Sequence, residues 1–130
     1  MAKTTLTRDD TYEEMGMAYQ ILQMDLLNQT LKQSGISDAG LRQKICEDFL
    51  FSLGDFHDEG WFDVDGKRIY PLLCFSTTFL NSDTDVNELG EVFAPSTSFA
   101  FHEYAHGDGS WYFEEHNEDA REIQRGSFGE

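Results

Sequence analysis

The chain has 130 residues, of which 39% are hydrophobic, and its 25 acidic residues against nine lysines and arginines give a net charge of −16. The eleven phenylalanines argue against disorder, and this length suffices for one domain with its own hydrophobic core. The charge argues against direct binding to DNA, RNA or an anionic membrane, because polyanions are bound through lysine and arginine.

Two helices are predicted over residues 11–54, after a loose, polar segment at 1–10. The first runs from Thr11 to Ser34, and its apolar stripe is broad enough that we expect it to contact a partner or a second copy as well as the core. Ser37 is expected to cap a second helix that ends at Gly54. The apolar rows are Met17, Ile21, Met24 and Leu31 in the first helix, widened by Met15, Ala18, Leu22 and Leu26, and Leu41, Ile45, Phe49 and Leu53 in the second.

The periodicity changes to two after Gly60, which predicts strands over residues 60–116. Residues 61–64 and 67–70 flank Asp65-Gly66, a strong signal for a tight hairpin, and the second strand continues to Leu80. After an acidic connection, a second hairpin is expected from residues 96–105 and 110–116, followed by a tail at 117–130. The sequence therefore predicts one α+β domain, with two helices packed on an antiparallel sheet of about four strands.

The segment His102-Glu103-Tyr104-Ala105-His106 matches the H-E-x-x-H pattern of zinc proteases. That chemistry requires a helix, in which residues four apart share one face and can grip a single ion. Apolar and polar residues alternate before His102 and glycines follow His106, so we predict a strand. In a strand the two histidines lie roughly 13 Å apart, and we expect no metal or other cofactor.

The predicted strands would instead gather a histidine, carboxylate and tyrosine face. Pairing across the turn at residues 107–109 puts His102 opposite Glu114, at about 5 Å between β-carbons. Such a pair could serve as a general base, or the face could simply be the solvated side of the sheet. The candidate catalytic residues are His102, Tyr104, Tyr112, Glu114 and His116.

Charge is segregated along the chain, because no lysine or arginine occurs between Ile69 and Ala120. Those 52 residues hold ten acids and ten aromatic residues, so we expect a folded surface of strong negative potential. An oxygen-rich loop at residues 83–87 resembles the start of a calcium loop but lacks its glycine and its final glutamate. The residues expected to bind a partner are Asp83, Asp85, Glu88, Glu91, Asp108, Glu114, Glu115, Glu118 and Asp119.

Three classes of function remain open at this stage. The first is an acidic inhibitor that mimics nucleic acid and occupies the basic surface of a nuclease or nucleic-acid-binding protein, as anti-defence and immunity proteins do. The second is a small enzyme or ligand binder that uses the histidine face. The third is a structural protein that forms a homodimer through its first helix. No signal peptide or stretch of 18 apolar residues is visible, so a cytoplasmic protein is expected.

Overall fold

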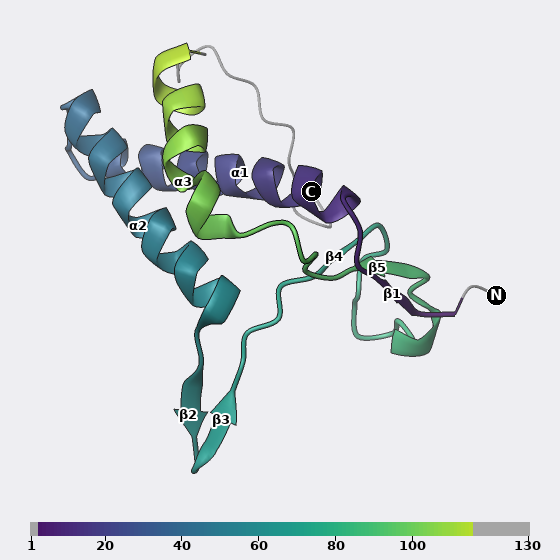
Figure 1. Ribbon diagram of the computed structural model, residues 1–130. Helices are drawn as coiled ribbons and strands as arrows, with labels where there is room; N and C mark the ends of the chain where they lie inside the picture. Colours follow the sequence, from purple (N-terminus) through teal and green to yellow (C-terminus); the bar gives the residue numbers. More distant parts are fainter. Residues whose placement is uncertain (1–2, 116–130) are drawn as a thin grey trace.

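The computed structural model describes residues 3–115 and has a mixed α+β architecture with three helices and two small sheets (Figure 1). The helices lie together in one part of the molecule, and the larger sheet lies beside the start of the first helix. No helix among the described residues is both long enough and apolar enough to span a bilayer. The elements are β1 (Thr5–Thr7), α1 (Thr11–Gln33), α2 (Ala39–Glu59), β2 (Phe62–Val64), β3 (Lys67–Ile69), β4 (Phe75–Ser76), the 3₁₀ turn η1 (Val86–Glu88), β5 (Glu91–Phe93), α3 (Phe101–Ser110) and the π-helical turn η2 (Trp111–Glu115).

The two N-terminal helices are confirmed, although the second is longer than predicted. Asp38, rather than Ser37, caps α2, because its carboxylate accepts the backbone N–H groups of Gly40 and Leu41 at 2.9 and 3.2 Å. Gly54 does not end the helix. A β-carbon at Gly54 would lie 2.8 Å from the backbone nitrogen of His102, so this glycine permits α2 and α3 to approach closely.

The second predicted hairpin is wrong, because residues 101–110 form helix α3. Its buried positions include Phe101, Ala105 and Asp108, followed by Tyr112 in η2, a spacing that places them on one face. The alternation that suggested a strand covers residues 97–101, which precede the helix or only begin it. The first hairpin is confirmed, since β2 pairs with β3 and both Asp65 and Gly66 have positive φ. Its second strand does not continue to Leu80 as predicted, because β3 ends at Ile69 and β4 belongs to the other sheet.

The predicted four-stranded sheet is replaced by two separate sheets. In the larger one, the strand order is β1-β5-β4, with β1 parallel and β4 antiparallel to β5. The N-terminal segment that was expected to be loose supplies β1, in which Thr5 pairs with Glu91 and Thr7 with Phe93. Strands β2 and β3 form a two-stranded arm that projects away from the helices (Figure 1).

The core is built from two clusters, to both of which α3 contributes buried residues. Tyr12, Phe93, Phe99 and Phe101 form one, and Met24, Leu50, Ala105 and Tyr112 form the other. The buried row of α1 is not the predicted one, of which only Met24 is fully buried. It consists of Tyr12, Gly16, Gln20, Met24 and Asn28.

Polar residues in that row have specific partners across the helix interfaces, although Gln20 Oε1 is buried without a hydrogen-bond partner among the described residues. Gln20 Nε2 donates to the backbone carbonyl of Phe101 at 3.0 Å, and Asn28 Oδ1 accepts from Arg42 Nε at 2.8 Å. Because these partners are distant in sequence, apolar periodicity along α1 could not indicate them.

Candidate functional site

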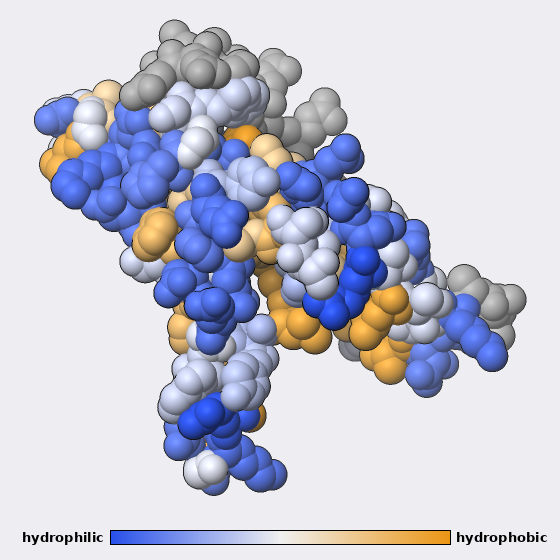
Figure 2. Space-filling model, viewed as in Figure 1, coloured by the Kyte–Doolittle hydropathy of each residue, from blue (hydrophilic) through white to orange (hydrophobic). Residues whose placement is uncertain are grey.

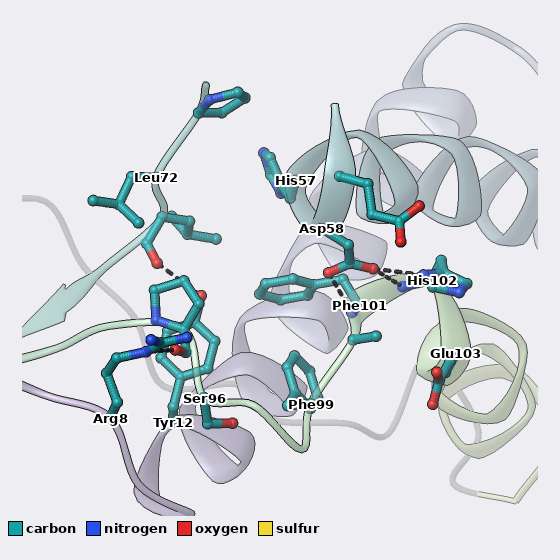
Figure 3. A pocket seen from close by; sticks show the side chains of 15 residues that line it. Arg8, Tyr12, His57, Asp58, Leu72, Ser96, Phe99, Phe101, His102 and Glu103 are labelled. Carbon is teal, nitrogen blue, oxygen red and sulfur yellow. Dashed lines mark hydrogen bonds and ion pairs between the residues drawn. The ribbon is translucent and has the colours of Figure 1, made fainter. Parts of the chain in front are cut away.

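A cavity of about 410 Å³ lies where α2 ends and α3 begins (Figure 3). Ligand sites commonly have volumes of this order. One side is formed by the start of α1 and the segment before it, and another by the chain that follows the arm. The cavity is lined by Arg8, Tyr12, His57, Asp58, Glu59, Pro71, Leu72, Leu73, Pro95, Ser96, Phe99, Ala100, Phe101, His102 and Glu103.

A histidine–aspartate pair stands at this cavity. His102 Nδ1 lies 2.6 Å from Asp58 Oδ2, and Asp58 also accepts the backbone N–H groups of Phe101 and His102 at 2.9 and 3.1 Å. Asp58 therefore caps α3 and orients the imidazole of its first turn, as the dashed lines in Figure 3 show. The hydrogen bond between His102 Nδ1 and the Asp58 carboxylate raises the pKa of His102. The other ring nitrogen, Nε2, is not bound by this carboxylate.

The pKa of a second histidine at the cavity, His57, is shifted in the opposite direction. Burial lowers the pKa of His57, whose ring meets the edge of Phe101 at 5.8 Å between centroids. His57 is thus predominantly neutral near pH 7, whereas His102 carries a larger share of positive charge. Two imidazoles at one cavity whose pKa values are shifted in opposite directions are an arrangement suited to acid–base chemistry.

The H-E-x-x-H segment lies on helix α3. The predicted strand, which was the reason for excluding a zinc site here, is therefore wrong. Each histidine is nevertheless bound to a carboxylate of α2, since His106 Nδ1 lies 2.7 Å from Glu47 Oε1. The Phe51 ring packs against both imidazoles, with centroid distances of 5.8 Å to His102 and 5.7 Å to His106. Residues 3–115 contain no group of three or more histidine, cysteine or acidic side chains placed to hold a metal ion. The two histidines instead join α3 to α2.

The other candidate catalytic residues do not gather around His102. Tyr104 donates to Glu13 Oε1 at 2.9 Å, and the buried Tyr112 donates to Asp25, so both tyrosines tie the third helix region to α1. The predicted cross-strand pair of His102 with Glu114 is wrong, because both positions are helical. The side chain of Glu114 and the whole of His116 lie outside the part of the chain that is described.

Four of the predicted partner-binding acids lie within nine residues of sequence, and we call them the acidic edge: Asp83, Asp85, Glu88 and Glu91. All four are exposed and lie on or beside η1 and β5. Asp85 caps η1 by accepting from the backbone of Asn87 at 2.9 Å, and Glu91 accepts from Thr7 Oγ1 at 2.8 Å. Glu91 lies on β5, and the pairing of this strand with β1 and β4 fixes the backbone at that end of the acidic edge.

The remaining acids of that prediction do not extend the acidic edge. Asp108 is only 5% exposed and faces the interior of the helical part, so it contributes nothing to a binding surface. The side chain of Glu115, and the residues Glu118 and Asp119, lie outside the described residues.

Asp58 is the residue that sequence reasoning missed. It lies in the last turn of α2 and caps α3 more than 40 positions later. A cap supplied from a distant helix leaves no local signal in the sequence of either element.

No family model, curated protein or solved structure matches this chain.

Proposed function

We propose that this protein is an acidic binding protein whose acidic edge occupies a basic surface of a partner protein. The observation that carries the proposal is the set of four exposed carboxylates within nine residues, in a part of the sequence that has no lysine or arginine from Ile69 to Ala120. None of the four forms an ion pair with a basic side chain of residues 3–115. Their charge is therefore available to another molecule.

Nucleases and nucleic-acid-binding proteins are the partner class that fits this chemistry best. Their binding grooves present lysine and arginine to phosphates, and carboxylates held on a rigid backbone can occupy the same positions. Charge complementarity of this kind accelerates association with a basic partner and disfavours binding of uncharged or acidic proteins. The settings in which such binding is useful are inhibition of a nuclease, immunity to a toxin and evasion of a defence system.

Neutralisation of the acidic edge tests the proposal. The edge variant carries Asp83→Asn, Asp85→Asn, Glu88→Gln and Glu91→Gln, which preserve the cap of η1 and the contact with Thr7. The matched control carries the same four-unit charge change at other exposed acids: Glu14→Gln, Asp48→Asn, Asp55→Asn and Asp65→Asn.

Extracts of the source organism should yield a basic protein that the wild type and the control retain and that the edge variant loses. Equal retention by the edge variant would show that the acidic edge is not the binding surface. Equal loss by the edge and control variants would show that only net charge matters, and the proposal of a specific surface would be abandoned.

A second candidate function rests on the histidine–aspartate pair at the cavity. A carboxylate that holds an imidazole through Nδ1 is an arrangement by which enzymes orient a general base. The partly buried Asp58 holds His102 in this way, and the cavity beside them is large enough for a small substrate. Hydrolysis of simple chromogenic esters or phosphoesters that disappears in His102→Gln but persists in His106→Gln would support this function. Equal rates in the wild type and His102→Gln would remove it.

A further inference from the structure

The arm formed by β2 and β3 has two faces of different character. Phe62 pairs with Ile69, and Val64 with Lys67, so these four side chains share one face. The three apolar residues of that face are 45%, 37% and 47% exposed for Phe62, Ile69 and Val64 respectively. We call this the apolar face of the arm.

On the opposite face of the arm, the polar side chains interact with other residues of the arm. The guanidinium of Arg68 lies 4.0 Å from the ring centroid of Trp61, and Asp63 stands directly across the strands from Arg68. Asp63 also accepts the backbone N–H of Gly66 at 2.9 Å. The side of the arm visible in Figure 2 is coloured mainly blue to white, with orange only at its margin.

A hairpin of two three-residue strands is marginally stable on its own in water. All six strand residues are exposed. The contact that links the apolar face to the helices is the stacking of Phe56, in the last turns of α2, on Phe62 at 6.4 Å between centroids. Phe56 is itself 38% exposed, so the apolar surface continues from the arm onto α2. Burial of this surface in an interface would stabilise the arm.

The charge of the arm indicates which molecule can cover it. Residues 61–70 contain Asp63, Asp65, Lys67 and Arg68 and are neutral overall, whereas the whole chain carries a charge of −16. A basic protein is drawn to the acidic surfaces and gains no charge attraction from a neutral arm. Two copies of this chain repel each other through their net negative charge, and this repulsion is weakest where the surfaces in contact carry no net charge.

The length of the arm also favours contact between two copies. Four residues from Phe62 to Asp65 extend roughly 13 Å at about 3.3 Å per residue. The Debye length at physiological salt is about 8 Å. Two copies that meet at their arms therefore hold much of their acidic bodies apart, at separations where salt can screen the remaining repulsion.

We propose that the apolar face of the arm is a self-association surface, on which Phe62, Val64 and Ile69 pack against the same residues of a second copy. The contact is isologous, as in most homodimers, and small. Because interfaces below about 1,200 Å² are typical of transient complexes, the dimer is expected to be weak. This surface is separate from the acidic edge and does not depend on the function proposed for it.

Sedimentation equilibrium of the full chain between low and high micromolar concentrations tests the proposal. Monomer–dimer behaviour is expected, and the dimer should strengthen as salt rises from 0.05 to 0.5 M, because screening reduces repulsion between the bodies while apolar contact persists. The pair Phe62→Ser and Ile69→Ser should weaken association by at least about tenfold, since four apolar side chains leave the dimer interface.

Two further variants make the result specific. Lys67→Glu leaves the apolar residues in place but makes the arm negative, and it should also weaken the dimer, most of all at low salt. The control pair Leu80→Ser and Val86→Ser removes equally exposed apolar side chains near the larger sheet and should leave association unchanged. Circular dichroism establishes that each variant is folded. A monomer at all concentrations and both salts, or a dimer that the folded arm variants do not weaken, would overturn the proposal.

Discussion

Asp108 is expected to make this protein less stable as the pH rises through neutrality. The residue is 5% exposed within α3, and its Oδ2 atom has no hydrogen-bond partner among the described residues. Burial raises the pKa of Asp108 from 3.8 to about 7. Because the folded state holds this proton more tightly than the unfolded state, the stabilising contribution is complete below about pH 4 and is lost progressively up to pH 7–8.

The size of the effect follows from the two pKa values. A difference between 3.8 and about 7, at 1.36 kcal/mol for each pH unit, amounts to about 4 kcal/mol of unfolding free energy. Proteins of this size are stable by about 5–15 kcal/mol in total. Ionisation of one side chain therefore removes a substantial part of the stability at alkaline pH.

Asp108→Asn tests this reasoning, since asparagine has nearly the same shape and cannot ionise. Urea unfolding followed by circular dichroism should give similar stability for the variant and the wild type at pH 4.5. At pH 8 the variant should be more stable, by up to about 4 kcal/mol. Asp83→Asn makes the same chemical change at an exposed position and should have little effect at either pH. A variant that is equally destabilised at both values would show that the carboxylate is needed in its ionised form and that the reasoning is wrong.

The remaining predictions concern the contact of α2 with α3. Gly54→Ala should destabilise the fold by about 1–3 kcal/mol in urea unfolding, because its β-carbon would lie 2.8 Å from the backbone of α3. Gly107→Ala, whose β-carbon would meet nothing within 4 Å, should instead be neutral or stabilising, and equal destabilisation of both would contradict the packing. NMR titration should place the pKa of His102 above 6.5 and that of His57 below it. The His102–Asp58 contact should therefore contribute fully below pH 6.5 and lose its contribution as pH rises through the folded pKa of His102. A His102 that titrates at or below 6.5 would mean that this contact does not form in solution.

The elements that were predicted correctly are those whose formation depends on residues close together in the sequence. The helix at 11–33 follows from apolar spacing, and the arm follows from Asp65-Gly66 between two alternating segments. Strand β1 could not be predicted in this way, because Thr5–Thr7 pairs with residues 91–93, which lie more than 80 positions further along the chain.

The error at α3 has a comparable physical origin. Phe99 and Phe101 alternate with polar neighbours as in a strand, but both belong to one core cluster that includes Tyr12 of α1. The first backbone N–H groups of α3 after Ala100 are capped by Asp58, which lies on another helix. The candidate site was therefore only partly predictable: His102 was identified, whereas its carboxylate partner was assigned to the wrong residue, Glu114.

The affinity of the captured basic partner, measured by calorimetry at 0.05 and 0.5 M salt, tests the central claim most directly. The Debye length shortens severalfold over this range, so binding of the wild type should weaken steeply. The edge variant, with neutral residues at 83, 85, 88 and 91, should bind weakly at low salt and show little further loss at high salt. Wild-type affinity that does not change with salt, together with unchanged affinity in the edge variant, would contradict the claim that the acidic edge is the binding surface.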